Sequence, residues 1–106
     1  MESKDLKNIE NIKEMSKVKP LLIEFMAPWC KFCDRLNPVV SEVIEEYGDK
    51  LDIVRVNIDD EKSLAVECEI VTIPAFLLFA DGEKKGELVN PPSKVAILKW
   101  LEAEGF

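Results

Sequence analysis

The chain has 106 residues, which suits one domain with a single hydrophobic core and leaves no room for a second. Apolar residues make up 47% of it and charged residues 33%, which is the balance of a globular rather than a disordered protein. The formal net charge of −7 argues against nucleic acid or an anionic membrane as a partner, because neutralising phosphates takes a basic face.

The first residues mix acidic and basic side chains, and no apolar stretch of the kind found in a secretory signal follows them. The longest apolar runs have the length of a strand, so we expect no segment that spans a bilayer. Three cysteines are too few, and odd in number, for a disulfide-stapled scaffold, which indicates a reducing compartment. We therefore expect residues 1–106 to form one monomeric, cytoplasmic domain.

Near the N-terminus, apolar residues recur every three positions, which predicts one face of a helix that stops before Pro20. These residues are Leu6, Ile9, Ile12 and Met15. An alternative is a short strand near Lys4–Asn8 followed by a helix from about Glu10. The almost unbroken apolar run Leu21–Met26 is typical of a strand buried on both faces of a sheet.

A loop is expected over Ala27–Phe32, followed by a helix over Cys33–Tyr47. Its apolar residues at helical spacing are Leu36, Val39, Val40, Val43, Ile44 and Tyr47. Pro38 lies inside this helix and should kink it, because proline removes one backbone hydrogen bond and clashes with the preceding turn. Gly48 is expected to end the helix as a left-handed cap.

The second half of the chain predicts a second inner strand over Leu51–Ile58 and a short helix over Glu61–Glu69. An apolar strand over Ala75–Ala80 follows. The turn Asp81-Gly82 joins it to an edge strand over Lys85–Val89.

Ser93 is expected to cap a last helix whose inner side carries Val95, Ile97, Leu98 and Leu101. Strand–helix–strand requires a parallel pair with a right-handed crossover, and the hairpin adds an antiparallel pair. The fold class is therefore α/β, with a central mixed sheet of four to five strands and helices on both faces.

Cys30 and Cys33 follow a predicted inner strand and open a helix, separated by Lys31 and Phe32. Two intervening residues let both sulfurs meet across one helical turn. Free N–H groups and the helix dipole at the first turn favour an anion, here the Cys30 thiolate that attacks disulfides. We predict Cys30 as an exposed nucleophile of low pKa, helped by Lys31, and Cys33 as a buried resolving thiol.

Half of a zinc site is the alternative interpretation of this cysteine pair. Zinc takes four ligands, and the chain offers Cys68 as a third thiol and no histidine. We therefore expect no metal and no cofactor. Cys68 is interpreted as a small, partly buried hydrophobic residue rather than a regulatory thiol.

Five stretches of the chain occur in a characteristic order: Leu22–Cys33, Pro38, Val56–Asp59, Ile73–Phe76 and Asp81-Gly82. With these stretches the chain resembles the thioredoxin family over nearly its whole length. The resemblance implies the thioredoxin fold and a thiol–disulfide oxidoreductase that reduces protein disulfides through the two cysteines. It also implies a thioredoxin-reductase-type electron donor.

The resemblance assigns the substrate-binding surface as well. Pro74 matches the family's cis-proline, and Ile73 before it offers its backbone to an extended substrate segment. Trp29 is expected to be a flat lid beside the sulfurs, and Lys31 and Phe32 to contact the substrate. The stretch Asn90-Pro91-Pro92 replaces a glycine-containing turn of the family, so we expect a stiffer groove of different shape.

Glu24 interrupts an inner strand, where an ionised group is costly unless it is paired. It matches the family's buried acid, which relays a proton to and from the resolving cysteine. The alternatives are a carboxylate in water at a strand end, or one paired with Arg55 on the neighbouring strand. The family usually has aspartate here with a lysine partner, whereas Arg55 cannot lose its proton.

The inner dipeptide is the larger departure, because thioredoxins have Gly-Pro where this chain has Lys31-Phe32. A free N–H and a positive charge both favour the thiolate, so we expect a more oxidising pair than thioredoxin. This departure keeps open a disulfide isomerase or oxidase, or a glutaredoxin-like protein of the same fold. A non-catalytic binding module is a further alternative.

Overall fold

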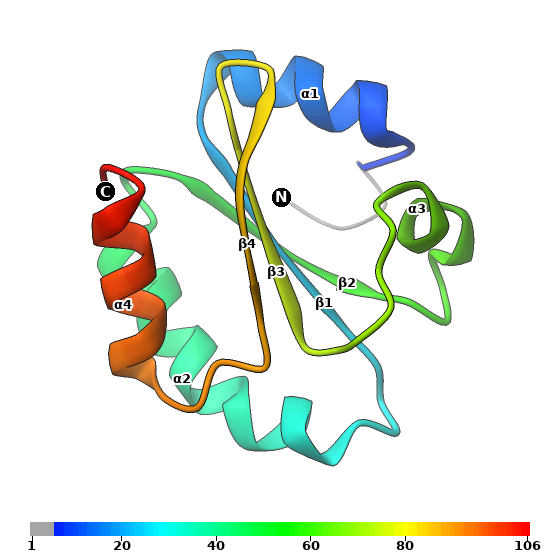
Figure 1. Cartoon of the computed structure of the whole chain (residues 1–106), viewed down its shortest axis with the longest axis vertical. Coiled ribbons are helices and arrows are strands. Elements are labelled where there is room, and N and C mark those ends of the chain that lie inside the picture. Colours follow the sequence, from blue (N-terminus) through cyan, green and yellow to red (C-terminus); the bar gives the residue numbers. More distant parts are fainter. Residues whose placement is uncertain (1–5) are drawn as a thin grey trace.

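A computed structural model describes residues 6–106 and contains four helices and four strands within them (Figure 1). In chain order these are α1 (Ile9–Val18), β1 (Leu21–Met26), α2 (Lys31–Tyr47), β2 (Asp52–Asn57), α3 (Lys62–Glu67), β3 (Ala75–Ala80), β4 (Glu83–Val89) and α4 (Lys94–Ala103). The predicted order of elements is confirmed. Of the alternative strand near Lys4–Asn8, Lys4 and Asp5 lie outside the described residues, and residues 6–8 are not in a strand.

The four strands form one mixed sheet in the order β2-β1-β3-β4. β1 pairs parallel with β2 and antiparallel with β3, and β4 pairs antiparallel with β3. The inner strands are therefore β1 and β3. The prediction that the strand after α2 is also an inner strand is wrong within the described residues: β2 lies at the edge and is only partly buried.

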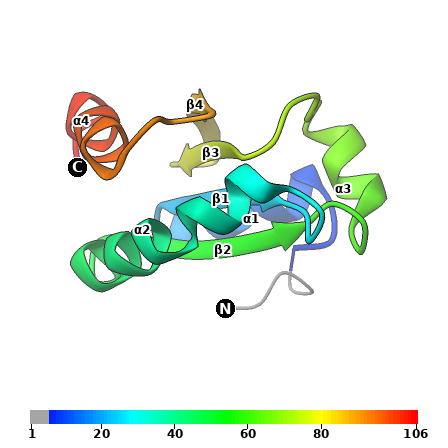
Figure 2. The ribbon, with the colours of Figure 1, turned by 90° about the horizontal axis from the view of Figure 1, so that it is seen from below.

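Helices cover both faces of this sheet, as predicted (Figures 1 and 2). Side chains alternate along β1, so Ile23 and Phe25 pack with residues of α1 and α3 in one core cluster. Leu22 points to the other face and packs with residues of α2 and α4. Glu24 belongs by the same alternation to the α2/α4 face, under the helix that begins at the cysteine pair.

Two predicted details at helix ends are wrong. Gly48 has a right-handed φ of −55°, because the chain continues in turns in which Leu51 N–H bonds to the Tyr47 carbonyl. Val95 is 58% exposed. Ile97 and Leu101 of α4 face the sheet, and a residue two positions before Ile97 points to the opposite side of the helix.

The hairpin turn explains why β4 begins earlier than the predicted Lys85. Asp81 and Gly82 both have positive φ, 55° and 81°, which is the geometry of a two-residue turn between twisted strands. The partner strand can therefore start directly at Glu83. Within the described residues no helix has the length and apolar character needed to cross a bilayer.

Candidate active site around Cys30 and Cys33

The cysteine pair lies where β1 leads into α2. Cys30 is the N-cap of α2, and its Sγ accepts a hydrogen bond of 3.2 Å from the backbone N–H of Cys33. The two side chains are joined by a disulfide, with Cα atoms 5.2 Å apart. Placing a sulfur at the cap puts it among the N–H groups that have no partner within the helix.

The order of accessibility is as predicted, but Cys30 is not exposed. Its exposure is 8%, against 2% for Cys33. The predicted exposure of Cys30 is wrong because apolar neighbours surround the disulfide: Ala27 is buried beside it, and Met26, Ile58 and Ile73 pack against it.

The Ile73–Pro74 peptide bond is cis, as predicted from the resemblance. The Pro74 carbonyl accepts a hydrogen bond of 3.0 Å from the N–H of Asn90, which joins the two loops at this end of the sheet. Ile73 packs on the cysteine pair. Among the described residues, no backbone hydrogen bond from another segment engages the N–H or carbonyl of Ile73.

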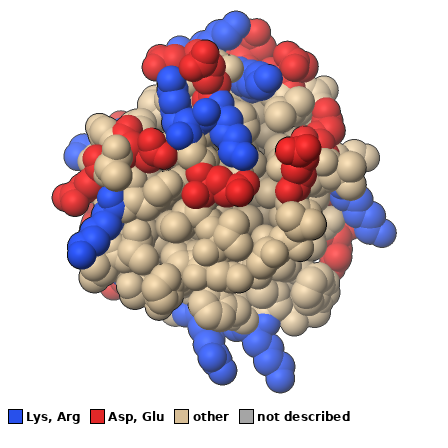
Figure 3. Space-filling view, viewed as in Figure 1, with Lys and Arg blue, Asp and Glu red and all other residues tan. Residues whose placement is uncertain are grey.

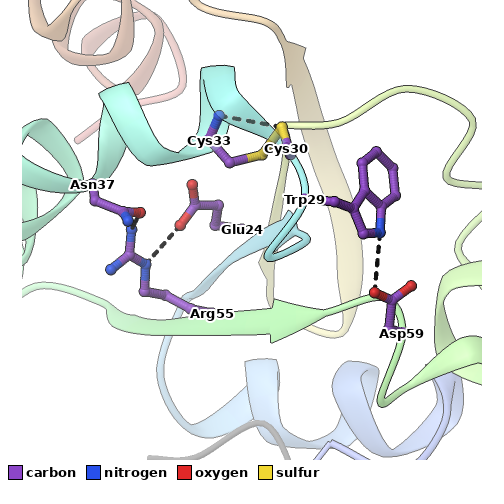
Figure 4. Close-up of a disulfide and its surroundings, with 7 residues drawn as sticks. All are labelled: Glu24, Trp29, Cys30, Cys33, Asn37, Arg55 and Asp59. Atoms are coloured by element: carbon purple, nitrogen blue, oxygen red, sulfur yellow. Dashed lines mark hydrogen bonds and ion pairs between the residues drawn. A yellow bond between two sulfur atoms is a disulfide. The ribbon is translucent and has the colours of Figure 1, made fainter.

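Trp29 lies beside the disulfide and is 64% exposed (Figure 4). Its Nε1–H donates a hydrogen bond of 3.0 Å to Oδ2 of Asp59, which fixes the edge of the ring. Phe32 is 40% exposed, and Lys31 is exposed in the first turn of α2. Polar and apolar groups thus flank the sulfurs on the outer surface.

Glu24 is fully buried, and Arg55 on the neighbouring strand donates from Nε to its Oε1 at 2.7 Å. Of the alternatives drawn from the sequence, the pairing of Glu24 with Arg55 is confirmed, and a carboxylate in water at a strand end is wrong because Glu24 is buried. Burial raises the pKa of Glu24, and the hydrogen bond and charge of Arg55 oppose that rise. The other oxygen, Oε2, is buried and accepts no hydrogen bond from any residue that the structure describes.

Cys68 lies in the core cluster on the α1/α3 face, not in the cluster that holds the disulfide. It is a buried free thiol, and burial raises its pKa to about 11. The zinc interpretation thereby loses its third thiol. Over residues 6–106 no group of three or more cysteine, histidine or acidic side chains is arranged to hold a metal ion.

Comparison with known proteins places these features in a family. The thioredoxin family profile matches residues 4–103. Thioredoxin 1 of Synechococcus elongatus is 35% identical over 83 residues, which is 78% of each chain. The chain belongs to the thioredoxin family. The M-type chloroplastic thioredoxin of Chlamydomonas reinhardtii is 37% identical over 83 residues, 78% of this chain and 59% of that protein.

A solved structure agrees with this assignment. Oxidised mitochondrial thioredoxin 3 of Saccharomyces cerevisiae superposes with a TM-score of 0.78 at 26% identity, covering 92% of this chain and 91% of that one. With the family established and the cysteine pair joined in a disulfide, this thioredoxin-family member is a thiol–disulfide oxidoreductase.

Sequence reasoning missed two polar residues of this thioredoxin-type site, Asp59 and Asn37. Asp59 follows β2, whose end lies beside the end of β1 because the strands are parallel, so its proximity to Trp29 could have been inferred. Asn37 accepts a hydrogen bond from Nη2 of Arg55. It lies four residues after Cys33 on one helix, a spacing that places both on one face.

Proposed function

We propose that this thioredoxin-family protein reduces disulfide bonds in other proteins and is itself reduced by a thioredoxin-reductase-type donor. The observation that carries the proposal is the placement of Cys30 at the cap of α2, with Cys33 more deeply buried behind it. That order suits an outer nucleophile and an inner resolving thiol. No observation favours the isomerase, the oxidase or a non-catalytic binding module.

The two sulfurs carry the electrons of the reaction. The Cys30 thiolate attacks one sulfur of the substrate disulfide, the substrate S–S bond breaks, and a mixed disulfide forms while one substrate sulfur leaves as a thiolate. Cys33 then loses its proton and attacks Cys30, which releases the second substrate sulfur and forms the Cys30–Cys33 disulfide. Two electrons from the donor reopen that bond.

The substrate is proposed to lie across Trp29, Lys31, Phe32, Ile73 and Pro74. In support, no backbone group of another segment within residues 6–106 bonds to the N–H or carbonyl of Ile73, so an extended peptide can pair with them. Figure 3 shows charged side chains crowded over the end of the molecule where α1 and the hairpin turn lie. Below them a broad area of this face carries no charged side chains until two basic side chains project at its lower edge, and this area suits a protein partner.

Glu24 is proposed to take the proton that Cys33 loses. Its carboxyl lies between Arg55 and the disulfide (Figure 4). A buried acid whose pKa is raised exchanges protons at a pH closer to neutral than an exposed one. Replacing Glu24 with glutamine keeps the shape of the side chain and removes this exchange.

We further propose that residues 1–106 act as one monomeric domain in the cytoplasm. The two larger core clusters lie on opposite faces of a single sheet, which supports one domain. The free thiol of Cys68 supports a reducing compartment. Some relatives are named as chloroplastic thioredoxins. Locating this protein in its own cells therefore tests the proposed compartment.

Reduction of insulin with dithiothreitol as electron source tests the central proposal. The unaltered protein should accelerate the reaction, and Cys30→Ser should abolish the acceleration. Cys33→Ser should retain a covalent Cys30–substrate adduct visible by mass spectrometry. Cys68→Ser is the matched control and should keep full activity. Equal rates with and without the unaltered protein would refute the reductase.

A further inference from the structure

Beneath the cysteine pair, three polar side chains from three elements are linked by hydrogen bonds (Figure 4). Glu24 comes from β1, Arg55 from β2 and Asn37 from α2. Arg55 donates from Nε to Oε1 of Glu24 at 2.7 Å and from Nη2 to Oδ1 of Asn37 at 2.5 Å. One guanidinium thus connects the buried carboxyl to the helix that carries the cysteines.

Asn37 lies four residues after Cys33 on α2, about one helical turn away and on the same face. A side chain that bonds to Asn37 is therefore kept at a fixed position relative to Cys33. Besides Glu24, Arg55 bonds to Asn37, and Asn37 lies on the same helix as the resolving sulfur.

Arg55 needs such an anchor because its side chain is 29% exposed and water competes for its donors. An arginine side chain also has many rotamers, and their entropy opposes a single fixed orientation. The amide oxygen of Asn37 adds a second hydrogen bond. Because Asn37 is neutral, it orients the guanidinium without introducing a charge that would compete with Glu24.

The two oxygens of Glu24 are left in different states. Oε1 accepts a hydrogen bond from Arg55, whereas the buried Oε2 accepts none from the described part of the chain. Leaving a buried acceptor unpaired is unfavourable, because the acceptor has lost its hydrogen bonds to water. In Figure 4 the oxygen that is not bonded to Arg55 is turned toward α2. Oε2 is therefore the oxygen available to a proton arriving from the cysteine side.

We propose that Asn37 is a positioning residue for the resolving step: it holds Arg55 on Oε1 of Glu24 and so leaves Oε2 to accept the proton of Cys33. This inference rests on the proposed role of Glu24. In the step, the Cys33 S–H bond breaks, its proton bonds to Oε2, and the sulfur bonds to Cys30. The bond between Cys30 and the substrate breaks, the leaving sulfur takes a proton from water, and Glu24 later returns its proton to water.

Arg55 is the charged side chain that acts on the ionisation of Glu24. Its register partner on β3 is Phe76, which is uncharged, and α4 contributes the apolar Ile97 and Leu101 to this face. Among the described residues, Arg55 supplies both interactions that oppose the effect of burial on the pKa of Glu24. Loosening Arg55 should therefore move the ionisation of Glu24 to higher pH.

The resolving step can be followed by mixing reduced protein with a chromogenic aryl disulfide in a stopped-flow instrument and timing release of the second aryl thiolate across a pH series. Asn37→Leu removes the amide oxygen that accepts the hydrogen bond from Arg55 and keeps a side chain of similar size. Asn37→Ala also removes this oxygen and serves if leucine does not fit. Either of these two variants should raise the midpoint of the pH profile by about 0.5 pH unit or more. Asn37→Gln keeps an amide oxygen and should restore the original midpoint.

Two further variants separate the possible failures. Ser41→Leu places a leucine one turn further along α2 and should leave the midpoint unchanged. Glu24→Gln should remove the pH step itself. If that step survives in Glu24→Gln, the proposed role of Glu24 is wrong and this inference is lost with it. If the step disappears there but Asn37→Leu matches the unaltered protein, or Asn37→Gln shifts equally, only the role of Asn37 is wrong.

Discussion

The backbone N–H of Cys33 donates a hydrogen bond to Sγ of Cys30 at 3.2 Å, so the first sulfur occupies the position where Asn8 and Ser93 cap their own helices with side-chain oxygens. Those caps stabilise a helix by satisfying a free N–H. A sulfur at the same position gains in return, because the donor and the helix dipole stabilise its negative charge.

The first prediction compares Cys30 with Cys68 in the reduced protein. Cys68 has a pKa of about 11, so about one molecule in ten thousand carries its thiolate at pH 7. Cys30 should have a pKa below the value of about 8.5 of a free thiol. Alkylation at neutral pH, followed by mass spectrometry of peptides, should modify Cys30 first and Cys68 last. Equal rates at the two thiols would contradict the role of the helix cap.

The second prediction concerns Glu24 and the pH dependence of stability. Its pKa is raised in the folded protein above the ordinary value of 4.5. For a raised pKa, the stability is fully present below 4.5 and is lost as pH rises through the folded value. The free energy of unfolding should therefore decline with pH in the unaltered protein relative to Glu24→Gln.

Urea unfolding at a series of pH values measures this difference. Glu102→Gln on the exposed side of α4 is the control and should follow the unaltered protein at every pH. Parallel curves for the unaltered protein and Glu24→Gln would show that the carboxyl keeps its ordinary pKa in the fold.

A third prediction concerns the charge of Arg55. Arg55→Met leaves the buried carboxyl without its counter-charge, which should cost about 3 kcal/mol at about pH 8. The loss should shrink at a second, more acidic pH, because burial raises the pKa of Glu24 and a protonated Glu24 needs no counter-charge. The double variant with Glu24→Gln should recover most of the stability at both pH values. A loss of equal size at both, measured by urea unfolding, would argue for packing rather than charge.

The sequence predicts features that depend on neighbouring residues and misses features that depend on contacts between distant parts of the chain. The Asp81-Gly82 turn and the Ser93 cap depend on neighbouring residues, so local patterns suffice to place them. Val95 was misplaced because the inner face of α4 is set by the sheet beneath it, with Ile97 at its centre. Gly48 was misassigned because the path of the chain after α2 depends on where β2 docks.

The site shows the same division. Cys30 and Cys33 are only three positions apart in sequence, and their chemistry can be inferred from that spacing. The contact between Arg55 and Glu24 could be foreseen as one possibility, because the two lie opposite each other on neighbouring parallel strands. Asn37 joins that pair only through the packing of α2 on the sheet, which no local pattern specifies.

The last prediction concerns the reduction potential of the cysteine pair. Lys31 and Phe32 are the first two residues of α2, next to the capping sulfur. The charge of Lys31 favours the thiolate and hence the reduced form. The backbone N–H of Phe32 has the same effect, and a proline at this position would lack that N–H. Stabilising the reduced form by about 1.4 kcal/mol raises the potential of a two-electron couple by about 30 mV.

We therefore expect a potential above the value of about −270 mV of thioredoxin with Gly-Pro between its cysteines. The double substitution Lys31→Gly and Phe32→Pro should lower it by about 30 mV, measured by equilibration with glutathione. Lys31→Gln removes the charge alone and Phe32→Pro the N–H alone, so the two single variants divide the effect between its causes. A potential below that of thioredoxin, or one that the double substitution leaves unchanged, would show that groups outside the dipeptide set the balance between dithiol and disulfide.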